Sequence, residues 1–407
     1  MSAPVETEDT TTGSLSRAAT LRVLQIVVVF AAVEGIVAPA DNVALVVLAT
    51  LVVLRLVQTG RVRLSSFQFA VLLALVAFLL LSLILVTVAH NPFRHTVRLQ
   101  TLVGFLITYL AFATTVRTRS AVQTMLLTFS FVAVAISVLS WLHLVFTFEF
   151  GHTILYARQI GPVSFWVPRT LGVKMPYGLF GIYASVAVSY FLALELYPEQ
   201  FECNGTKARI LALGGLVTVL SGVYVAQSRS TLFAMSAVFG VVLSVTLVRK
   251  TNVGLFVSLL LCFVSFLFVL ADPVRTIVPS DSLSVLSRLE QYRFAIEVLR
   301  DAPLTGVGFE RIGDLRDDQI HNFWLSMGAK TGLAGLFIWI YLFAMVVRRS
   351  IQEAVSYSAP RAAFGLIVLA TLAGTIVELL FFTGFNQSIG LLLGLVASTA
   401  GVEPRSE

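Results

Sequence analysis

Charged residues are scarce in this chain of 407 residues: Asp, Glu, Lys and Arg together make up 12%, whereas 57% of the residues are hydrophobic. The mean hydropathy of +0.90 is too high for a soluble protein, because an aqueous core cannot hold that many apolar side chains. The composition therefore excludes a soluble enzyme and predicts a protein whose main solvent is lipid.

Cysteines and basic runs are also few. The two cysteines, Cys203 and Cys262, lie in a short polar loop and in an apolar run, so neither a disulfide framework nor a CxxC metal site is available. The net charge is +6, but the absence of any run of five or six basic residues argues against binding of nucleic acid. HExxH, DxD and P-loop patterns are missing too, so we expect no metal centre and no cofactor.

Apolar runs long enough to cross a bilayer recur along the chain. A spanning helix needs about 20 mainly apolar residues, and this criterion predicts an all-α, polytopic integral membrane protein with about 12 transmembrane helices. The predicted spans are 21–38, 42–58, 67–88, 99–116, 121–148, 176–197, 209–227, 231–248, 253–271, 323–347, 362–382 and 385–402.

The spans divide the chain into five parts. Residues 1–20 are rich in Thr and acidic side chains and are expected to be a disordered cytosolic tail. Nine spans occupy 21–271, a large extracytoplasmic loop occupies 272–322, and three further spans occupy 323–402. A second short cytosolic tail, 403–407, ends the chain.

The distribution of Lys and Arg predicts the orientation. With both termini in the cytosol, fifteen basic residues lie in inner connections and six in the short outer ones. The six are Arg94, Arg98, Arg158, Arg169, Lys174 and Arg229. This bias predicts a multi-pass protein of the cytoplasmic (inner) membrane. His90 and His95 are expected in a short outer loop beside Arg94 and Arg98, as an interfacial anchor or a second basic patch.

Two outer segments, 149–175 and 272–322, are longer than connectors need to be, which is typical of functional or disordered loops. The second has a helical apolar pattern formed by Leu289, Tyr292, Ile296 and Leu299. This spacing predicts an amphipathic helix on the membrane face, ended by Pro303 and a turn at 306–308.

The polar side chains near the outer face each allow two interpretations. Arg229 interrupts two apolar runs, so it is either an interfacial arginine or an anion site, because a guanidinium binds phosphate oxygens in a bidentate way. Arg288 and Arg293 form either a solvated helix face or a similar site. Glu378 is an intramembrane carboxylate that we expect to pair with an outward arginine, either as part of a site or structurally.

His321 and Asn322 directly precede a predicted span. Asn322 is a good N-cap, and the positive end of the helix dipole favours a neutral His321. A neutral imidazole at the membrane face is either a general base for a hydroxyl group or an ordinary polar cap.

Three motifs, taken together, resemble the O-antigen ligase superfamily, which includes O-antigen ligases, surface-glycan polymerases and protein O-oligosaccharyltransferases. The first is His321-Asn322, then nine residues, then Gly332-Leu333-Ala334. The second runs from Arg288 through Pro303 to Gly306-Val307-Gly308, and the third is Gln227-Ser228-Arg229-Ser230. The resemblance covers about 220–345, and it departs from the family at Lys330, where an acidic residue is expected.

The resemblance implies a GT-C-like membrane protein that acts as an inverting, metal-independent glycosyltransferase. It implies a polyprenyl-diphosphate-linked glycan as donor and the hydroxyl group of a glycan, lipid or protein as acceptor, in contact with membrane lipid. The implied catalytic residues are Arg229 and Arg288, which bind the diphosphate, and His321, which acts as the base. The implied substrate-binding residues are Asn322, Arg293, Arg169 and Gly332.

Three alternatives stay open. A polymerase of the same fold would extend a lipid-linked chain instead of capping a different acceptor. A transporter or flippase of lipid-linked glycans would place ionisable residues near the midplane, in two related halves. A non-catalytic assembly scaffold is the third, if Lys330 marks a degenerate site.

Overall fold

The computed structural model describes most of the chain. The described residues are 10–32, 49–50, 52–53, 64–87, 89, 92–150, 156–160, 163–167, 177–201, 205–226, 229–249, 282–309, 320, 322–356, 358–380, 392–396 and 398. The predicted span at 253–271 lies outside them, as do most of 42–58 and 385–402. The count of twelve spans therefore stays a prediction.

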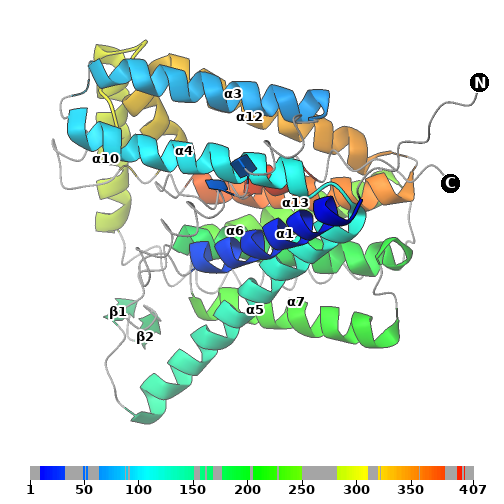
Figure 1. Ribbon diagram of the computed structural model, residues 1–407. Helices are drawn as coiled ribbons and strands as arrows, with labels where there is room; N and C mark the ends of the chain where they lie inside the picture. Colours follow the sequence, from blue (N-terminus) through cyan, green and yellow to red (C-terminus); the bar gives the residue numbers. More distant parts are fainter. Residues whose placement is uncertain are drawn as a thin grey trace, which may run out of the picture.

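The described elements are mainly helices that run side by side (Figure 1). The helices are α1 (Thr10–Ala32), α3 (Ser66–Ile84), α4 (Pro92–Thr115), α5 (Arg119–Phe150), α6 (Tyr177–Leu196), α7 (Thr206–Ala226), α8 (Arg229–Val248), α10 (Ser282–Asp301), α12 (Phe323–Ala354) and α13 (Ala359–Leu379), with short 3-10 turns η1 (Leu85–Thr87) and η3 (Pro198–Gln200). Within the described part, six helices are long and apolar enough to cross a membrane: Ser66–Thr87, Arg119–Leu142, Thr206–Val225, Ser230–Val248, Phe323–Ala354 and Ala359–Leu379. The chain is therefore a polytopic membrane protein, as predicted.

One short β-hairpin accompanies the helices of the otherwise all-α fold. Strands β1 (Tyr156–Ile160) and β2 (Val163–Val167) pair antiparallel, with Tyr156 opposite Val167. They lie in the segment 149–175, which was expected to be an outer loop. Valine and aromatic residues at alternate positions of β2 favour a strand, and Gly161-Pro162 lies between the strands.

Helix α13 lies at the centre of the bundle, where it contacts α6, α8 and α12. It is buried along most of its length, whereas α3 and α7 are buried along about a third of theirs and leave large apolar side chains exposed on the rest. Small residues allow the close approach: an added Cβ at Gly374 of α13 would overlap the Ser185 side chain of α6. Close backbone contact through small residues is how helices associate in lipid, where burial of apolar surface gives no driving force.

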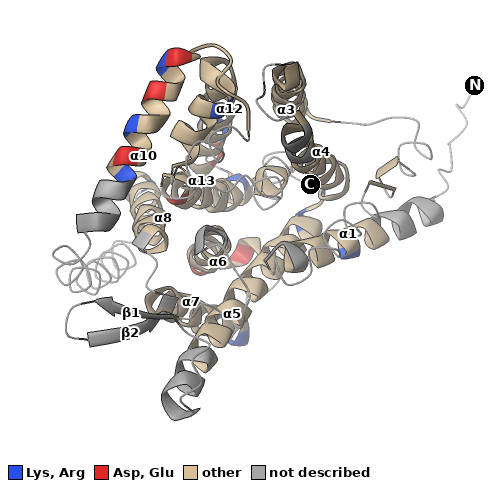
Figure 2. Cartoon of the chain, turned by 90° about the vertical axis from the view of Figure 1, so that its left-hand side faces the viewer, with Lys and Arg blue, Asp and Glu red and all other residues tan. Residues whose placement is uncertain are grey.

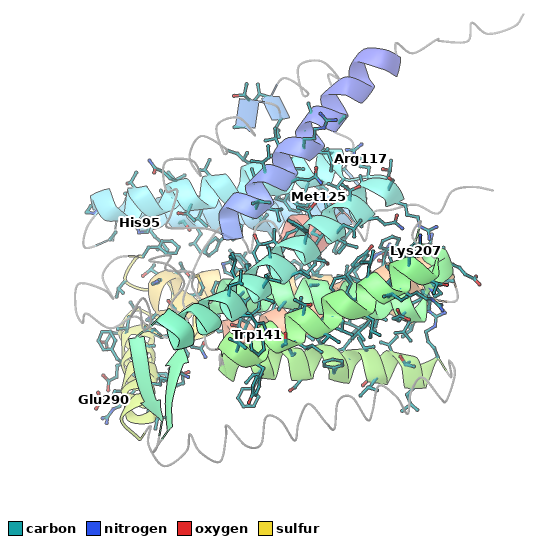
Figure 3. The ribbon with its side chains drawn as sticks, turned by 90° about the horizontal axis from the view of Figure 1, so that it is seen from below. His95, Arg117, Met125, Trp141, Lys207 and Glu290 are labelled. Carbon is teal, nitrogen blue, oxygen red and sulfur yellow. The ribbon has the colours of Figure 1, made fainter. Side chains whose placement is uncertain are left out.

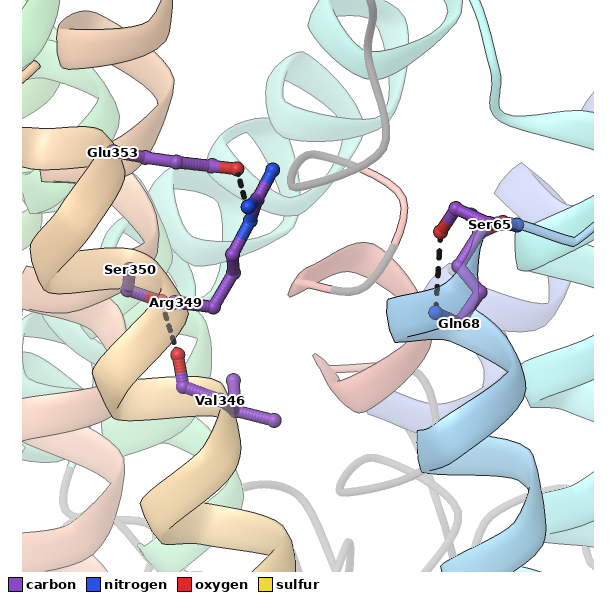
Figure 4. Close-up of polar contacts among 6 residues, drawn as sticks. All are labelled: Ser65, Gln68, Val346, Arg349, Ser350 and Glu353. Atoms are coloured by element: carbon purple, nitrogen blue, oxygen red, sulfur yellow. Dashed lines mark hydrogen bonds and ion pairs between the residues drawn. The ribbon is translucent and has the colours of Figure 1, made fainter.

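Local capping sets where α3 begins (Figure 4). The Ser65 hydroxyl accepts a hydrogen bond from the Gln68 amide at 3.2 Å, and Gln68 Oε1 accepts one from the Ser65 amide at 3.0 Å. This capping box satisfies two backbone donors that a helix start leaves unpaired. Figure 4 also shows the last turns of α12, where Arg349 Nε lies 2.7 Å from Glu353 Oε1.

The two ends of the bundle differ in charge. Figure 3 shows His95 and Glu290 at one end, which we call the α10 end, and Arg117 and Lys207 at the other, which we call the basic end. At the basic end, two arginines form hydrogen bonds that connect neighbouring helix ends. Arg249 donates to the Ala354 carbonyl at 3.3 Å, and Arg119 donates to Gln200 Oε1 at 3.1 Å.

The side chains of Arg249 and Arg119 also stack on aromatic rings at the basic end, above Tyr197 and Phe364 respectively. Among the described residues, the helix ends predicted to be cytosolic thus lie at one end, and those predicted to be outer lie at the other.

Thiol labelling tests this sidedness. In a protein without Cys203 and Cys262, a cysteine introduced as Glu290→Cys should react with a membrane-impermeant maleimide in intact cells. One introduced as Lys207→Cys should react only after the membrane is opened, because positively charged ends stay in the cytosol. Both positions are exposed at their surfaces, so accessibility within the protein is matched. Equal labelling in intact cells would contradict the predicted orientation.

Candidate functional site

Helix α12 is broken at Gly332, whose φ of 66° and ψ of −172° are not helical. The break divides α12 into a first segment, 323–331, and a longer second segment, 333–354. In an unbroken helix the Leu333 amide would donate to the carbonyl four residues earlier, at Ala329. Here it donates instead to the Pro303 carbonyl at 2.7 Å, outside the helix. The break therefore changes the partners of the backbone groups around Gly332.

The turn that follows α10 supplies the replacement partners. The Val307 amide donates to the Ala329 carbonyl at 3.1 Å, and the Gly308 amide donates to the Lys330 carbonyl at 2.9 Å. Two carbonyls that lack helical partners are thus paired, as buried backbone groups require. The turn 303–308 and the break in α12 form one hydrogen-bonded unit, which we call the turn–break junction.

Glycine is required at two positions of this junction. Gly306 and Gly332 both have positive φ, 62° and 66°, where other L residues are strained. A Cβ at Gly306 would lie 2.5 Å from the Lys330 carbonyl carbon, and one at Gly332 would overlap the Leu304 carbonyl group. The two glycine motifs that carry the family resemblance thus meet face to face. The sequence predicts a turn at Gly306 but gives no sign of this contact.

The chain on each side of His321 is fixed, although His321 itself lies outside the described residues. Asn322 caps α12: its Oδ1 accepts from the Leu325 amide at 3.0 Å, as predicted from the sequence. On the other side, Ile320 is buried in a small core with Ala295, Val298, Val307 and Ala329, which we call the α10 cluster. The start of α12 is therefore held against α10.

Helix α10 has the position and the termination expected for the amphipathic helix, although it begins earlier, at Ser282. The side that packs on the protein holds Gln291, Ala295 and Val298. Leu289 and Ile296 of the predicted apolar pattern are each 56% exposed. They are available to lipid, as an interfacial helix requires.

The arginines of α10 differ in their surroundings. Arg288, in the first half of the helix, is half-buried, whereas Arg293 is exposed and pairs with Glu297 at 3.1 Å. Figure 2 shows blue and red residues alternating along the outward side of α10, which runs across the bundle end from α12 toward α8. Mixed charge on this side matches the solvated-face interpretation for Arg293. Its predicted substrate contact stays a prediction.

Arg229 is the first residue of α8, and its side chain lies outside the described residues. The two residues that follow it bind Glu378 of α13: the Ser230 hydroxyl donates to Glu378 Oε1 at 2.8 Å, and the Thr231 hydroxyl lies 3.3 Å from the same atom. Glu378 is fully buried. The described partners of this intramembrane carboxylate are two hydroxyl groups, and its expected pairing with an outward arginine stays a prediction.

Space for the Glu378 carboxyl group comes from Gly181 of α6. A Cβ at Gly181 would lie 2.5 Å from Cδ of Glu378, so any larger residue would displace the carboxyl group. Three helices, α6, α8 and α13, thus meet at this buried group. The start of α8, from which Arg229 extends, is anchored to the centre of the bundle.

His95 does not lie in an outer loop. It is in the first turns of α4, which begins at Pro92, seven residues before the predicted span, and its side chain is fully buried. The neighbouring residues Arg94 and Arg98 suggested a surface, but the packing of α4 places the His95 side chain in the interior.

The structure says less about the remaining predicted site residue, Arg169, and about metal binding. Arg169 lies outside the described residues. In the described part of the chain, no three His, Cys, Asp or Glu side chains come together in a way that could hold a metal ion.

The apolar helices, α10 and the turn–break junction define a polytopic membrane protein with a helix-and-turn structure across one end of its bundle. Residues 214–340 match the family model described as O-Antigen ligase, so the resemblance inferred from the motifs is confirmed for this segment, about a third of the chain. The matched segment includes α8, α10, the turn–break junction and the first part of α12. No curated protein matches the chain.

The geometry of the turn–break junction predicts the effect of adding a side chain at its two glycines. Gly306→Ala and Gly332→Ala should each lower the free energy of unfolding by about 1–3 kcal/mol from backbone strain alone, with more from steric overlap. The midpoint of thermal unfolding in detergent measures the loss. Gly240→Ala is the control, because an added Cβ there meets nothing within 4 Å and alanine is the better helix former. Equal midpoints for the three variants would contradict the requirement for glycine at the junction.

The contact between Gly181 and Glu378 is testable as a double-mutant cycle. Gly181→Ala should destabilise the protein by about 1–3 kcal/mol, because it overfills a packed site. The cost should be smaller in a Glu378→Asp background, since the shorter side chain withdraws the carboxyl group. Unfolding midpoints of the two single variants and the double variant give the coupling. Strictly additive effects would show that the two positions do not interact.

Proposed function

We propose that the protein is an inverting, metal-independent glycosyltransferase of the O-antigen ligase type, which transfers a glycan from polyprenyl diphosphate to an acceptor hydroxyl group. The observation that carries the proposal is the match of 214–340 to the O-antigen ligase family, because this segment contains Arg229, Arg288 and His321. The packing of α10 on the start of α12 supports it further, since it brings together the elements that carry Arg288 and His321.

The chemistry requires positive charge at the leaving group. The bond between the sugar carbon and the diphosphate oxygen breaks, and the diphosphate leaves with the electron pair. Arg229 and Arg288 neutralise the growing negative charge, because guanidinium groups bind phosphate oxygens in a bidentate way. Arg229 is also at the N-terminus of α8, where the helix dipole adds partial positive charge.

His321 accepts the proton of the acceptor hydroxyl group as its oxygen bonds to the sugar carbon. The N-terminus of α12, capped by Asn322, disfavours a positive charge on the ring before the reaction. In this proposal Asn322, Arg293, Arg169 and Gly332 help to bind or hold the substrates. The diphosphate meets water at the outer face while the prenyl chain stays in lipid.

Single substitutions test the proposed roles. Arg229→Ala, Arg288→Ala and His321→Ala should each lower the rate of glycan transfer by about 10²–10³-fold, as expected when a charge-stabilising or proton-accepting group is removed. The assay measures release of polyprenyl diphosphate by purified protein in detergent, with donor and acceptor supplied. Arg300→Ala is the matched control, because Arg300 is an exposed arginine in the last turn of α10. Normal transfer by all three variants would refute the assignment.

The glycan products of the same reaction separate the alternatives. A ligase attaches a preformed chain to a different acceptor, whereas a polymerase yields longer lipid-linked chains. A transporter has two observations in its favour: α12 is a broken helix, and Glu378 is a buried intramembrane carboxylate. A transporter would leave the donor intact in detergent, where no gradient exists.

A further inference from the structure

His95 joins three parts of the protein at the α10 end. Its Nδ1 accepts a hydrogen bond from the Phe309 amide at 3.2 Å, and its Nε2 lies 2.8 Å from the Ser82 carbonyl oxygen. Ser82 is in the last turn of α3, where carbonyl groups lack helical partners, and Phe309 directly follows the turn–break junction. The ring therefore links the end of α3 and the start of α4 to the junction.

These two contacts define the protonation of the ring. An amide can only donate, so Nδ1 must be unprotonated, and Nε2 must then carry the hydrogen that it donates to Ser82. His95 is thus a neutral imidazole with both nitrogens in use, and it is fully buried. A buried polar ring whose hydrogen bonds are both made orients its neighbours, because leaving either partner unpaired is costly.

Packing around His95 is adapted to this link. The rings of His95 and Phe309 lie 5.2 Å apart, and Phe309 also meets Phe78 of α3 edge to face at 6.4 Å. Gly308 has a φ of 87°, and a Cβ there would lie 3.3 Å from Nδ1 of His95. The chain at 308–309 therefore approaches the ring closely because it has a glycine at that point.

The turn is consequently held on two sides. On one side its amides bind the carbonyls of α12 next to the break, and on the other side Phe309 binds His95. The chain passes through this turn on its way from α10, which carries Arg288, to His321. Movement of the turn would change the position of α10 relative to the start of α12.

We infer that His95 is a positioning residue of the transfer site, which fixes the turn after α10 and thereby the placement of the groups on α10 and at the start of α12. This inference rests on the proposed function for its effect on catalysis, whereas the link itself is a property of the fold. His95 makes no contact with substrate in this scheme. Its loss should therefore lower kcat and leave the KM for the donor nearly unchanged.

Two amide substitutions separate the two hydrogen bonds. In His95→Asn the side-chain oxygen lies as many bonds from the backbone as Nδ1, so it can accept from Phe309 but cannot reach Ser82. In His95→Gln the terminal amide lies where Nε2 was, so it can bind Ser82 but leaves the Phe309 amide unpaired. Both variants keep a polar side chain at position 95. Thr96→Ala, at an exposed neighbouring position of α4, is the control.

Two measurements on purified protein in detergent test whether His95 fixes the turn and positions the site. Hydrogen exchange of the amides in 304–309 should be faster in His95→Gln than in wild type and close to wild type in His95→Asn. In the transfer assay, kcat should fall about tenfold in His95→Gln, the effect of one lost hydrogen bond, while His95→Asn should stay within about twofold. The donor KM should change by less than about twofold in both.

The outcomes that overturn the inference differ from those that overturn the proposed function. Equal exchange in His95→Asn and His95→Gln would show that His95 does not hold the turn. Faster exchange with unchanged kcat in His95→Gln would show that the turn does not position the site. Wild-type protein that transfers no glycan would refute the proposed function, and the exchange data would still show whether the link to Phe309 exists.

Discussion

The exchange of backbone hydrogen bonds at Gly332 is the interaction on which the α10 end depends. A helix in lipid has no water to pair its amides, so a break is tolerated only where other protein groups replace the lost partners. The turn 303–308 provides one acceptor and two donors in the required places. Neither part can pair its backbone groups alone. Without the break, the amides of the turn would lack acceptors, and without the turn, the carbonyls next to the break would lack donors. This reciprocity places α10 against the start of α12.

Much of the helical framework could be predicted from hydropathy and capping. The predicted span at 67–88 corresponds to the candidate span Ser66–Thr87, and the span at 121–148 lies within α5, Arg119–Phe150. Asn322 begins α12 as its side chain suggested. These features depend on residues that are close in sequence, so local patterns are sufficient to find them.

The features that were missed depend on contacts between distant parts of the chain. A glycine within an apolar run is compatible with an unbroken helix, and only the turn at 303–308 makes Gly332 a break. His95 has polar neighbours in sequence, yet its partners are Ser82 and Phe309, which α3 and the turn bring to it. Glu378 likewise takes its partners from α8 through the packing of three helices.

The α10 cluster is a core separate from the one that holds the spans together. Five small or medium side chains bury far less apolar surface than the main core, so local unfolding of this unit requires much less free energy than unfolding of the bundle. We expect the two cores to unfold as separate units. The smaller core can therefore open while the membrane-spanning scaffold stays folded, so a change in the α10 unit need not lower the stability of the bundle in the bilayer.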